Sequence, residues 1–146
     1  MLQIAIVNGP NLNLTGTREQ HIYGSQTLED YFSQMRQQYL QVSFTIFQSN
    51  IEGELINFLH SCRGKMQGII LNGGAYTHTS IALADAIAAI DIPVVEVHIS
   101  NIYAREPYRR QSYTAEKCAG CITGLGLKGY ELATEYFIDR LNTIAS

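Results

Sequence analysis

Hydrophobic residues along the chain fall into short apolar runs, which are typical of buried strands, and longer segments with a helical period. Turn-forming residues close several runs, as in Asn-Gly-Pro at 8–10 and Asn-Gly-Gly at 72–74. The pattern predicts strands over residues 2–7, 43–48, 67–71, 94–99 and 120–124. It predicts helices over about 27–40, 54–62, 79–90 and 128–142, and irregular structure over 101–116.

This alternation of strand and helix with short connections predicts a parallel sheet covered on both faces, because parallel neighbours need crossover connections. The expected fold class is α/β: a flavodoxin-like three-layer sandwich with a five-stranded parallel sheet of order 2-1-3-4-5. Ligands in such sheets bind beyond the carboxyl ends of the strands, near the point where the strand order reverses. We therefore expect polar segments 8–23, 72–78 and 98–110 to meet at one edge.

Length and composition indicate how many domains the chain has and which class of partner it binds. Its 146 residues, 46% of them hydrophobic, suit one domain over residues 1–146, which we expect to be catalytic. The net charge of −3 argues against a general nucleic-acid or anionic-membrane binder and favours a small-molecule partner. No apolar run approaches the roughly 20 residues that span a bilayer, so a cytoplasmic location is predicted.

Cysteine and glycine patterns resemble redox, zinc and dinucleotide-binding motifs, but their positions in the chain argue against each of these sites. Cys118 and Cys121 form a C-x-x-C that leads into a strand, and with Cys62 they are predicted to be structural. No metal site is expected, because no second pair completes four zinc ligands. A G-x-G-x-x-G at 124–129 has only 17 residues after it, too few for a dinucleotide-binding unit, so its glycines are expected to pack helix against strand.

Histidines and acids at the predicted edge are candidates for acid–base chemistry. His98 ends the fourth strand, and Glu96, two residues earlier on the same face, is placed to hold the imidazole in one tautomer. His78 is predicted to open a helix, with Asp85 seven residues later on the same face. Each signal is weak alone, because an isolated histidine on a buried strand is often structural.

Tyr23 is the candidate base. It lies in the long loop after the first strand, five positions from Arg18. The pKa of a free phenol is about 10, and guanidinium charges nearby favour tyrosinate, which would make a base available near neutrality. The alternative is a surface tyrosine, since the chain has nine.

The Arg- and Tyr-rich segment 103–110 would also suit a single-stranded RNA groove, but clustered arginines beside a ligand edge fit carboxylate recognition better.

Several strings in one order carry a family resemblance. They are NGPNLNL at 8–14, GTRE at 16–19, IYG at 22–24, LNGGAYTHTS at 71–80, EVHISN at 96–101, REPYRR at 105–110, GLG at 124–126 and GY at 129–130. Together they resemble type II 3-dehydroquinate dehydratase over nearly the whole chain. The resemblance implies a flavodoxin-like fold and dehydration of 3-dehydroquinate to 3-dehydroshikimate through an enolate, a step of the shikimate pathway towards chorismate, with no metal or organic cofactor.

The resemblance also implies catalytic roles. Tyr23 matches the base and Arg18 matches the residue that assists it, both in the family's lid. Asn72 matches the asparagine that binds substrate through the water on the enolate oxygen, and His98 matches the acid that protonates the leaving hydroxyl. The three groups supply what the reaction needs, namely a base, a stabiliser of the enolate and an acid.

Further positions match substrate contacts. The backbone amides of Ile99 and Ser100 match those that bind the substrate carboxylate, and His78, Asp85 and Arg109 match other contacts. Members typically assemble as dodecamers, tetramers of trimers, in which the acid at the position of Asp85 reaches a neighbouring site. Departures from the pattern are Gln20, Gly73 and Gln111, none of which removes a reacting group. A non-catalytic flavodoxin-like module that binds a nucleotide or flavin is the alternative, and the step itself serves both biosynthesis and quinate breakdown.

Overall fold

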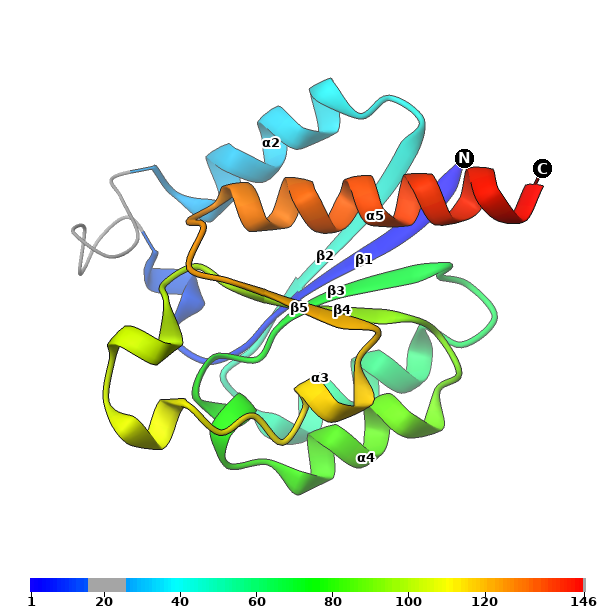
Figure 1. Ribbon diagram of the computed structural model, residues 1–146. Helices are drawn as coiled ribbons and strands as arrows, with labels where there is room; N and C mark the ends of the chain where they lie inside the picture. The colour runs from blue at the N-terminus through cyan, green and yellow to red at the C-terminus, as the bar shows by residue number, and fades with distance from the viewer. Residues whose placement is uncertain (16–25, 146) are drawn as a thin grey trace.

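A computed structural model describes residues 1–15 and 26–145, and its centre is a five-stranded, all-parallel sheet of order β2-β1-β3-β4-β5 (Figure 1). The strands are β1 (Leu2–Asn8), β2 (Val42–Gln48), β3 (Gly68–Asn72), β4 (Val94–His98) and β5 (Gly120–Thr123). The α-helices are α2 (Leu28–Gln38), α3 (Glu52–Ser61), α4 (Ile81–Ala89) and α5 (Lys128–Ala145). Short 3₁₀ helices are η1 (Leu12–Leu14), η2 (Gly74–His78), η3 (Ile102–Ala104), η4 (Pro107–Arg109) and η5 (Ala115–Lys117).

Helices cover both faces of the sheet and form two separate apolar cores. Helices α2 and α5 lie on one face, and α3 and α4 lie on the other (Figure 1). The alternation of β1 shows how the sequence builds both layers: Ile4 and Ile6 pack toward α2 and α5, whereas Ala5 and Val7 pack toward α3 and α4. This arrangement confirms the predicted fold class and strand order.

Each predicted strand and helix is present, with ends that differ by at most three residues. Side-chain caps explain two of the observed starts. Thr27 accepts a hydrogen bond from the backbone N–H of Asp30 at the start of α2, and Ser80 accepts one from the backbone N–H of Leu83 at the start of α4. The segment predicted to be irregular is built from η3, η4 and η5 joined by turns. No helix within the described residues is both long and apolar enough to cross a membrane.

Of the three glycines in the G-x-G-x-x-G string, only Gly129 packs helix against strand as predicted, whereas Gly126 has a φ of +65° and nothing within 4 Å of an added Cβ atom. A Cβ atom at Gly129 would lie 3.1 Å from Cγ1 of Val97, so this residue lets α5 approach β4 closely. Gly124 has a φ of +86°, and a Cβ atom there would lie 2.9 Å from Cβ of Asn101. The string therefore holds the turn between β5 and α5 against the segment after β4.

Gly9 lets the ends of β1 and β3 touch. Its N–H donates to the carbonyl oxygen of Asn72 at 2.7 Å. A Cβ atom at Gly9 would lie only 2.4 Å from the carbonyl oxygen of Gly73, a backbone atom that no side-chain rotation can move away. The close approach of these two strand ends thus depends on the absence of a side chain at Gly9.

We expect Gly9→Ala to lower the free energy of unfolding by about 1 to 3 kcal/mol, the usual cost of overpacking a tight site. Gly53→Ala is the matched control, because Gly53 lies in α3 with nothing within 4 Å of its added Cβ. That control should gain about 0.5 to 1 kcal/mol from helix propensity. Urea unfolding followed by circular dichroism measures both, and equal stability of the two variants would contradict the prediction.

Candidate active site

The three polar segments that follow β1, β3 and β4 meet at one edge of the sheet and line a cavity of about 110 Å³, as predicted. The segment after β1 contributes Pro10, Asn11 and Leu12. Six of the residues proposed from the sequence also line the cavity: Asn72, His78, His98, Ile99, Ser100 and Arg109. The carboxyl ends of the central strands therefore bring together most of the candidate chemistry.

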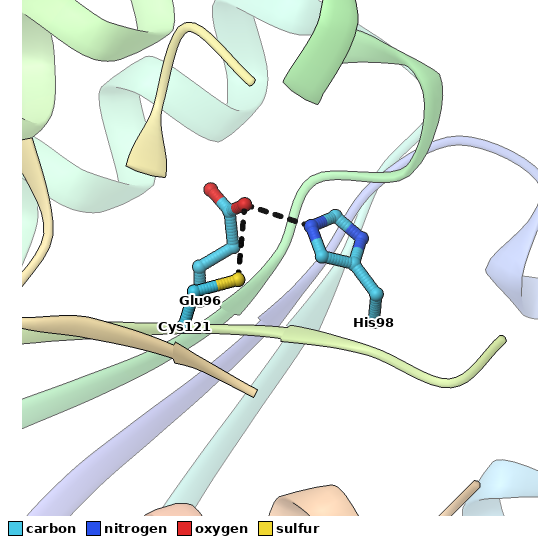
Figure 2. Close-up of side chains that lie close together, drawn as sticks. All are labelled: Glu96, His98 and Cys121. Carbon is cyan, nitrogen blue, oxygen red and sulfur yellow. Dashed lines mark hydrogen bonds and ion pairs between the residues drawn. The ribbon is translucent and has the colours of Figure 1, made fainter. Parts of the chain in front are cut away.

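His98 lies at the end of β4, with its side chain 5% exposed, and its Nε2 atom is 2.7 Å from Oε2 of Glu96 (Figure 2). The two residues are two positions apart on one strand, so their side chains point to the same face. An ionised carboxylate only accepts hydrogen bonds, so Nε2–H of His98 donates to Glu96. This contact fixes the ring and leaves Nδ1 as the nitrogen that does not contact Glu96.

Glu96 is fully buried and tightly held. Ser112 Oγ lies 3.0 Å from Oε2, and the Thr114 hydroxyl donates to Oε1. Burial raises the pKa of Glu96, but the hydrogen bond and charge of His98, together with the two hydroxyl donors, outweigh it and keep the pKa below its ordinary value. The carboxylate is thus ionised at neutral pH and accepts the hydrogen bond from His98.

Asn72, at the end of β3, has a fixed carboxamide. Its Nδ2 atom donates to the Tyr130 hydroxyl at 3.0 Å, and its Oδ1 atom accepts from the backbone N–H of Gly74 at 3.3 Å. The Tyr130 hydroxyl in turn donates to Oδ1 of Asn8 at 2.8 Å. Because Asn8, Asn72 and Tyr130 are all buried, Asn72 meets the cavity in one orientation.

His78 stacks near His98, with ring centroids 6.1 Å apart, and its Nδ1 atom is 2.7 Å from the carbonyl oxygen of Gln111. Burial lowers the pKa of His78, and the nearby charges of His98 and Arg109 lower it further, whereas the hydrogen bond to Gln111 raises it. The net shift is downward, so His78 is neutral near pH 7. Its Nδ1–H donates to the carbonyl, which leaves Nε2 as an acceptor.

One prediction about His78 is wrong. The residue does not open the helix that carries Asp85, because it ends η2 and the Ser80 cap starts α4 three residues later. The same-face argument for the two side chains therefore fails. Asp85 is exposed on α4 and is not among the residues that line the cavity.

The segment after β4 supplies backbone amides and cations. The carbonyl oxygen of His98 accepts from the N–H of Gly124 at 3.1 Å, and that of Ile99 accepts from the N–H of Gly126 at 3.0 Å. These two bonds fix the peptide planes that carry the N–H groups of Ile99 and Ser100. Arg105 and Arg109 line the cavity, and no described residue of the lining is acidic. The cavity is therefore suited to an anion such as a carboxylate.

Two predicted catalytic residues and one departure from the family pattern fall in the segment 16–25. Tyr23 and Arg18, with Gln20, lie outside the described residues. Gly73 has an ordinary φ of −74°, and the space of its missing side chain is taken by Thr77, whose Oγ1 would lie 2.9 Å from an added Cβ. Gln111 contributes its backbone carbonyl, which any residue supplies, so this departure keeps the contact with His78.

Ser112, Thr114 and Tyr130 were missed by the sequence analysis. Ser112 and Thr114 lie 16 and 18 residues after the carboxylate that they hold, and Tyr130 lies 58 residues after Asn72. No periodicity or local motif connects such positions. The only available signal was the glycine-tyrosine pair at 129–130 within the resemblance.

The comparison with protein families decides the family of the chain. The family described as "Dehydroquinase class II" matches residues 2–138. The chain belongs to the type II dehydroquinase family. This membership confirms the resemblance found in the sequence and favours an enzyme over a non-catalytic module that binds a nucleotide or flavin.

Individual members of the type II dehydroquinase family are similar over nearly their whole length. The chain is 50% identical to a 3-dehydroquinate dehydratase of Sulfurimonas denitrificans, over 98% of this chain and 91% of that protein. It is 49% identical to a catabolic 3-dehydroquinase of Aspergillus oryzae, over 91% and 88%. The crystal structure of type II dehydroquinase from Butyrivibrio crossotus matches with a TM-score of 0.88 and 41% identity, covering 93% of this chain and 97% of that chain.

Proposed function

We propose that the cavity at the edge of the sheet dehydrates 3-dehydroquinate with Tyr23, Arg18, Asn72 and His98 as its catalytic residues. As a type II dehydroquinase, the chain is a lyase that converts 3-dehydroquinate to 3-dehydroshikimate and water. The observation that carries the residue assignment is the buried His98–Glu96 pair, which opens onto the same cavity as Asn72. This grouping supports the assignment of an acid and an oxyanion partner to one site.

The proposed reaction begins with removal of a proton from the carbon next to the ketone. Tyr23, kept ionised by Arg18, takes this proton, and the electron pair moves onto the carbonyl oxygen to give an enolate. Asn72 holds the water that hydrogen-bonds the enolate oxygen, and the rigid network around its carboxamide supports this role. Collapse of the enolate expels the hydroxyl group, which leaves as water after accepting a proton from His98.

Substrate binding in this proposal rests on the segment after β4 and on η2. The backbone amides of Ile99 and Ser100 bind the carboxylate of the substrate, and Arg109 and His78 contact its polar groups. Two observations support this assignment. The peptide planes that carry the N–H groups of Ile99 and Ser100 are fixed. The described lining carries Arg105 and Arg109, and Arg109 is also paired with Glu106, which lies outside the lining. Neutral His78 can accept a hydroxyl hydrogen bond at Nε2.

We also propose an oligomeric state and a cellular location for this chain. We place the chain in a dodecamer, a tetramer of trimers, in which Asp85 acts at the site of a neighbouring subunit. The exposure of Asp85 on α4, apart from the lining of its own cavity, supports a role outside its own subunit. A cytoplasmic location is supported by the three cysteines, which are all free thiols as in most proteins of reducing compartments.

An absorbance assay for the conjugated enone product tests the proposal. Chelator-treated protein should still form the enone from 3-dehydroquinate, because the proposed chemistry uses no metal. Borohydride with substrate should not inactivate it, because no imine with lysine forms; none of Lys65, Lys117 and Lys128 lines the cavity within the described structure. Absence of activity under these conditions, or trapping by borohydride, would reject the proposed reaction path.

Replacing Arg109 should weaken substrate binding more than turnover. We expect Arg109→Ala to raise KM about tenfold to a hundredfold, because hydrogen bonds to charged groups contribute about 1.5 to 3 kcal/mol. Arg110→Ala is the control, since Arg110 is exposed next to Arg109 and does not line the cavity. Steady-state kinetics measure both variants. A similar KM for the two would remove Arg109 from the binding site.

A further inference from the structure

Behind the proposed acid lies a thiol that the reaction does not use. Cys121 pairs with Glu96 in the register of β5 with β4, so the two side chains stand on the same face of the sheet. Figure 2 shows the sulfur of Cys121 directed at the same carboxylate oxygen that meets His98. The Sγ to Oε2 distance is 3.7 Å, and the ligand atoms of the three residues all lie within 4.8 Å of one another.

We propose that Glu96, His98 and Cys121 form a site for a thiophilic divalent cation, with Zn²⁺ as the best match, and that occupation of this site inhibits the dehydratase. Imidazole, thiolate and carboxylate are the three ligand types that Zn²⁺ takes in proteins. Three protein ligands leave the fourth tetrahedral position for water, as in open zinc sites.

The distances fit tetrahedral zinc with small movements. From standard zinc–ligand lengths, the ligand atoms of such a site lie about 3.3 to 3.6 Å apart. The Cys121 sulfur is already 3.7 Å from Oε2 of Glu96. The His98 nitrogen lies 2.7 Å from the same oxygen, so a rotation of the imidazole that lengthens this contact makes room for the ion. Because both strands are fixed in the sheet, side-chain motion alone has to bring the ligand atoms to the distances of a zinc site.

Charge also favours a dication at this place. Within residues 1–15 and 26–145, His98 is the sole ion-pair partner of the buried Glu96 carboxylate. Burial, followed by the charge of Glu96, raises the pKa of the Cys121 thiol to about 12, so the thiol is protonated without a metal. A bound Zn²⁺ displaces that proton, and its two positive charges balance the thiolate and the carboxylate.

The site can be approached from solvent. Cys121 is an exposed residue on β5, the edge strand of the sheet, and His98 lines the cavity on the other side of the group. An ion held at Nε2 would prevent His98 from carrying protons on both ring nitrogens. The remaining Nδ1–H would then belong to a neutral imidazole, which is a far weaker acid than imidazolium. Inhibition rests on the proposed function, whereas metal binding does not.

Cobalt absorption tests the binding step. Chelator-treated full-length protein, in buffer without thiols, is titrated with CoCl₂ and followed by thiolate-to-cobalt charge-transfer absorption. We expect a band that saturates at one Co²⁺ per chain and disappears on addition of ZnCl₂. Cys121→Ser should abolish the band while keeping a hydrogen-bond donor toward Glu96. Cys118→Ser and Cys62→Ser, the matched controls, should retain it.

Enone assays with ZnCl₂ test the consequence. Wild-type turnover should fall and recover with chelator, and Cys121→Ser, with turnover near wild type in the absence of zinc, should need at least tenfold more Zn²⁺ for the same loss. Lack of a cobalt band in the wild type, or a band that survives in Cys121→Ser, would overturn the site itself. A cobalt band without zinc inhibition would overturn only the inhibitory role, and an inactive wild type would overturn the proposed function instead.

Discussion

His98→Ala is expected to lower kcat by about 10²- to 10⁴-fold, the range that general acid–base groups contribute, with a much smaller change in KM. The reason is local. His98 is buried at the end of β4, paired with an ionised carboxylate behind it, and it faces the cavity with its second nitrogen. Alanine removes the ring that Glu96 orients, so the leaving hydroxyl departs without this proton donor. The enone assay under saturating substrate measures the loss.

His60→Ala provides the control for this variant. His60 lies exposed on α3 and has no role in the proposed chemistry, so its removal should leave kcat unchanged. Circular dichroism of His98→Ala should show retained secondary structure, which separates loss of chemistry from loss of fold. Turnover within a fewfold of wild type in His98→Ala would show that another group protonates the leaving hydroxyl.

Tyr23→Phe is expected to reduce kcat to a similar or greater extent while substrate still binds. Only the ionisable oxygen is lost, and a phenyl ring accepts no proton. Lowering the pKa of a phenol by two units takes about 2.7 kcal/mol of charge stabilisation, which one or two guanidinium groups in a partly dry pocket supply. Turnover from the enone assay, together with calorimetric titration of substrate into the variant, separates chemistry from binding.

Tyr103→Phe is the matched control for the base, because Tyr103 is more than half exposed on η3 and does not line the cavity. Its kcat and KM should both equal those of the wild type. If Tyr23→Phe kept near-normal rates, the base would have to be another residue. Loss of substrate binding together with turnover would instead give Tyr23 a role in forming the pocket.

The sequence predicted the sheet because its signals were local. Apolar runs such as β1 and β4 are buried on both faces, and turn residues mark their ends, so the hydrophobic pattern and the turn residues suffice to locate the strands. Helix starts were less accurate, since the Ser80 cap shortens α4 and leaves His78 outside it. A helix start depends on the side chain of one capping residue, whereas the periodic pattern of apolar residues can extend beyond that residue, so the pattern alone does not show where the helix begins.

Sequence reasoning brought candidate residues together where they follow strand ends, and it did not find contacts between residues that are distant in sequence. Asn72 and His98 end β3 and β4, so the fold class alone placed them at one edge. The hydroxyls of Ser112 and Thr114 and the thiol of Cys121 reach Glu96 from other segments. Their convergence follows from tertiary packing and strand register, which a single sequence does not encode in any short pattern.

The Tyr130 hydroxyl has a consequence for engineering this enzyme. Through it, α5 is joined to Asn8 and Asn72 on two different strands. A truncation or redesign of this C-terminal helix would therefore reach the reacting edge of the sheet as well as the core. Libraries intended to alter solubility should spare the first turn of α5, and changes selected in that turn should be screened for altered catalysis as well as for yield.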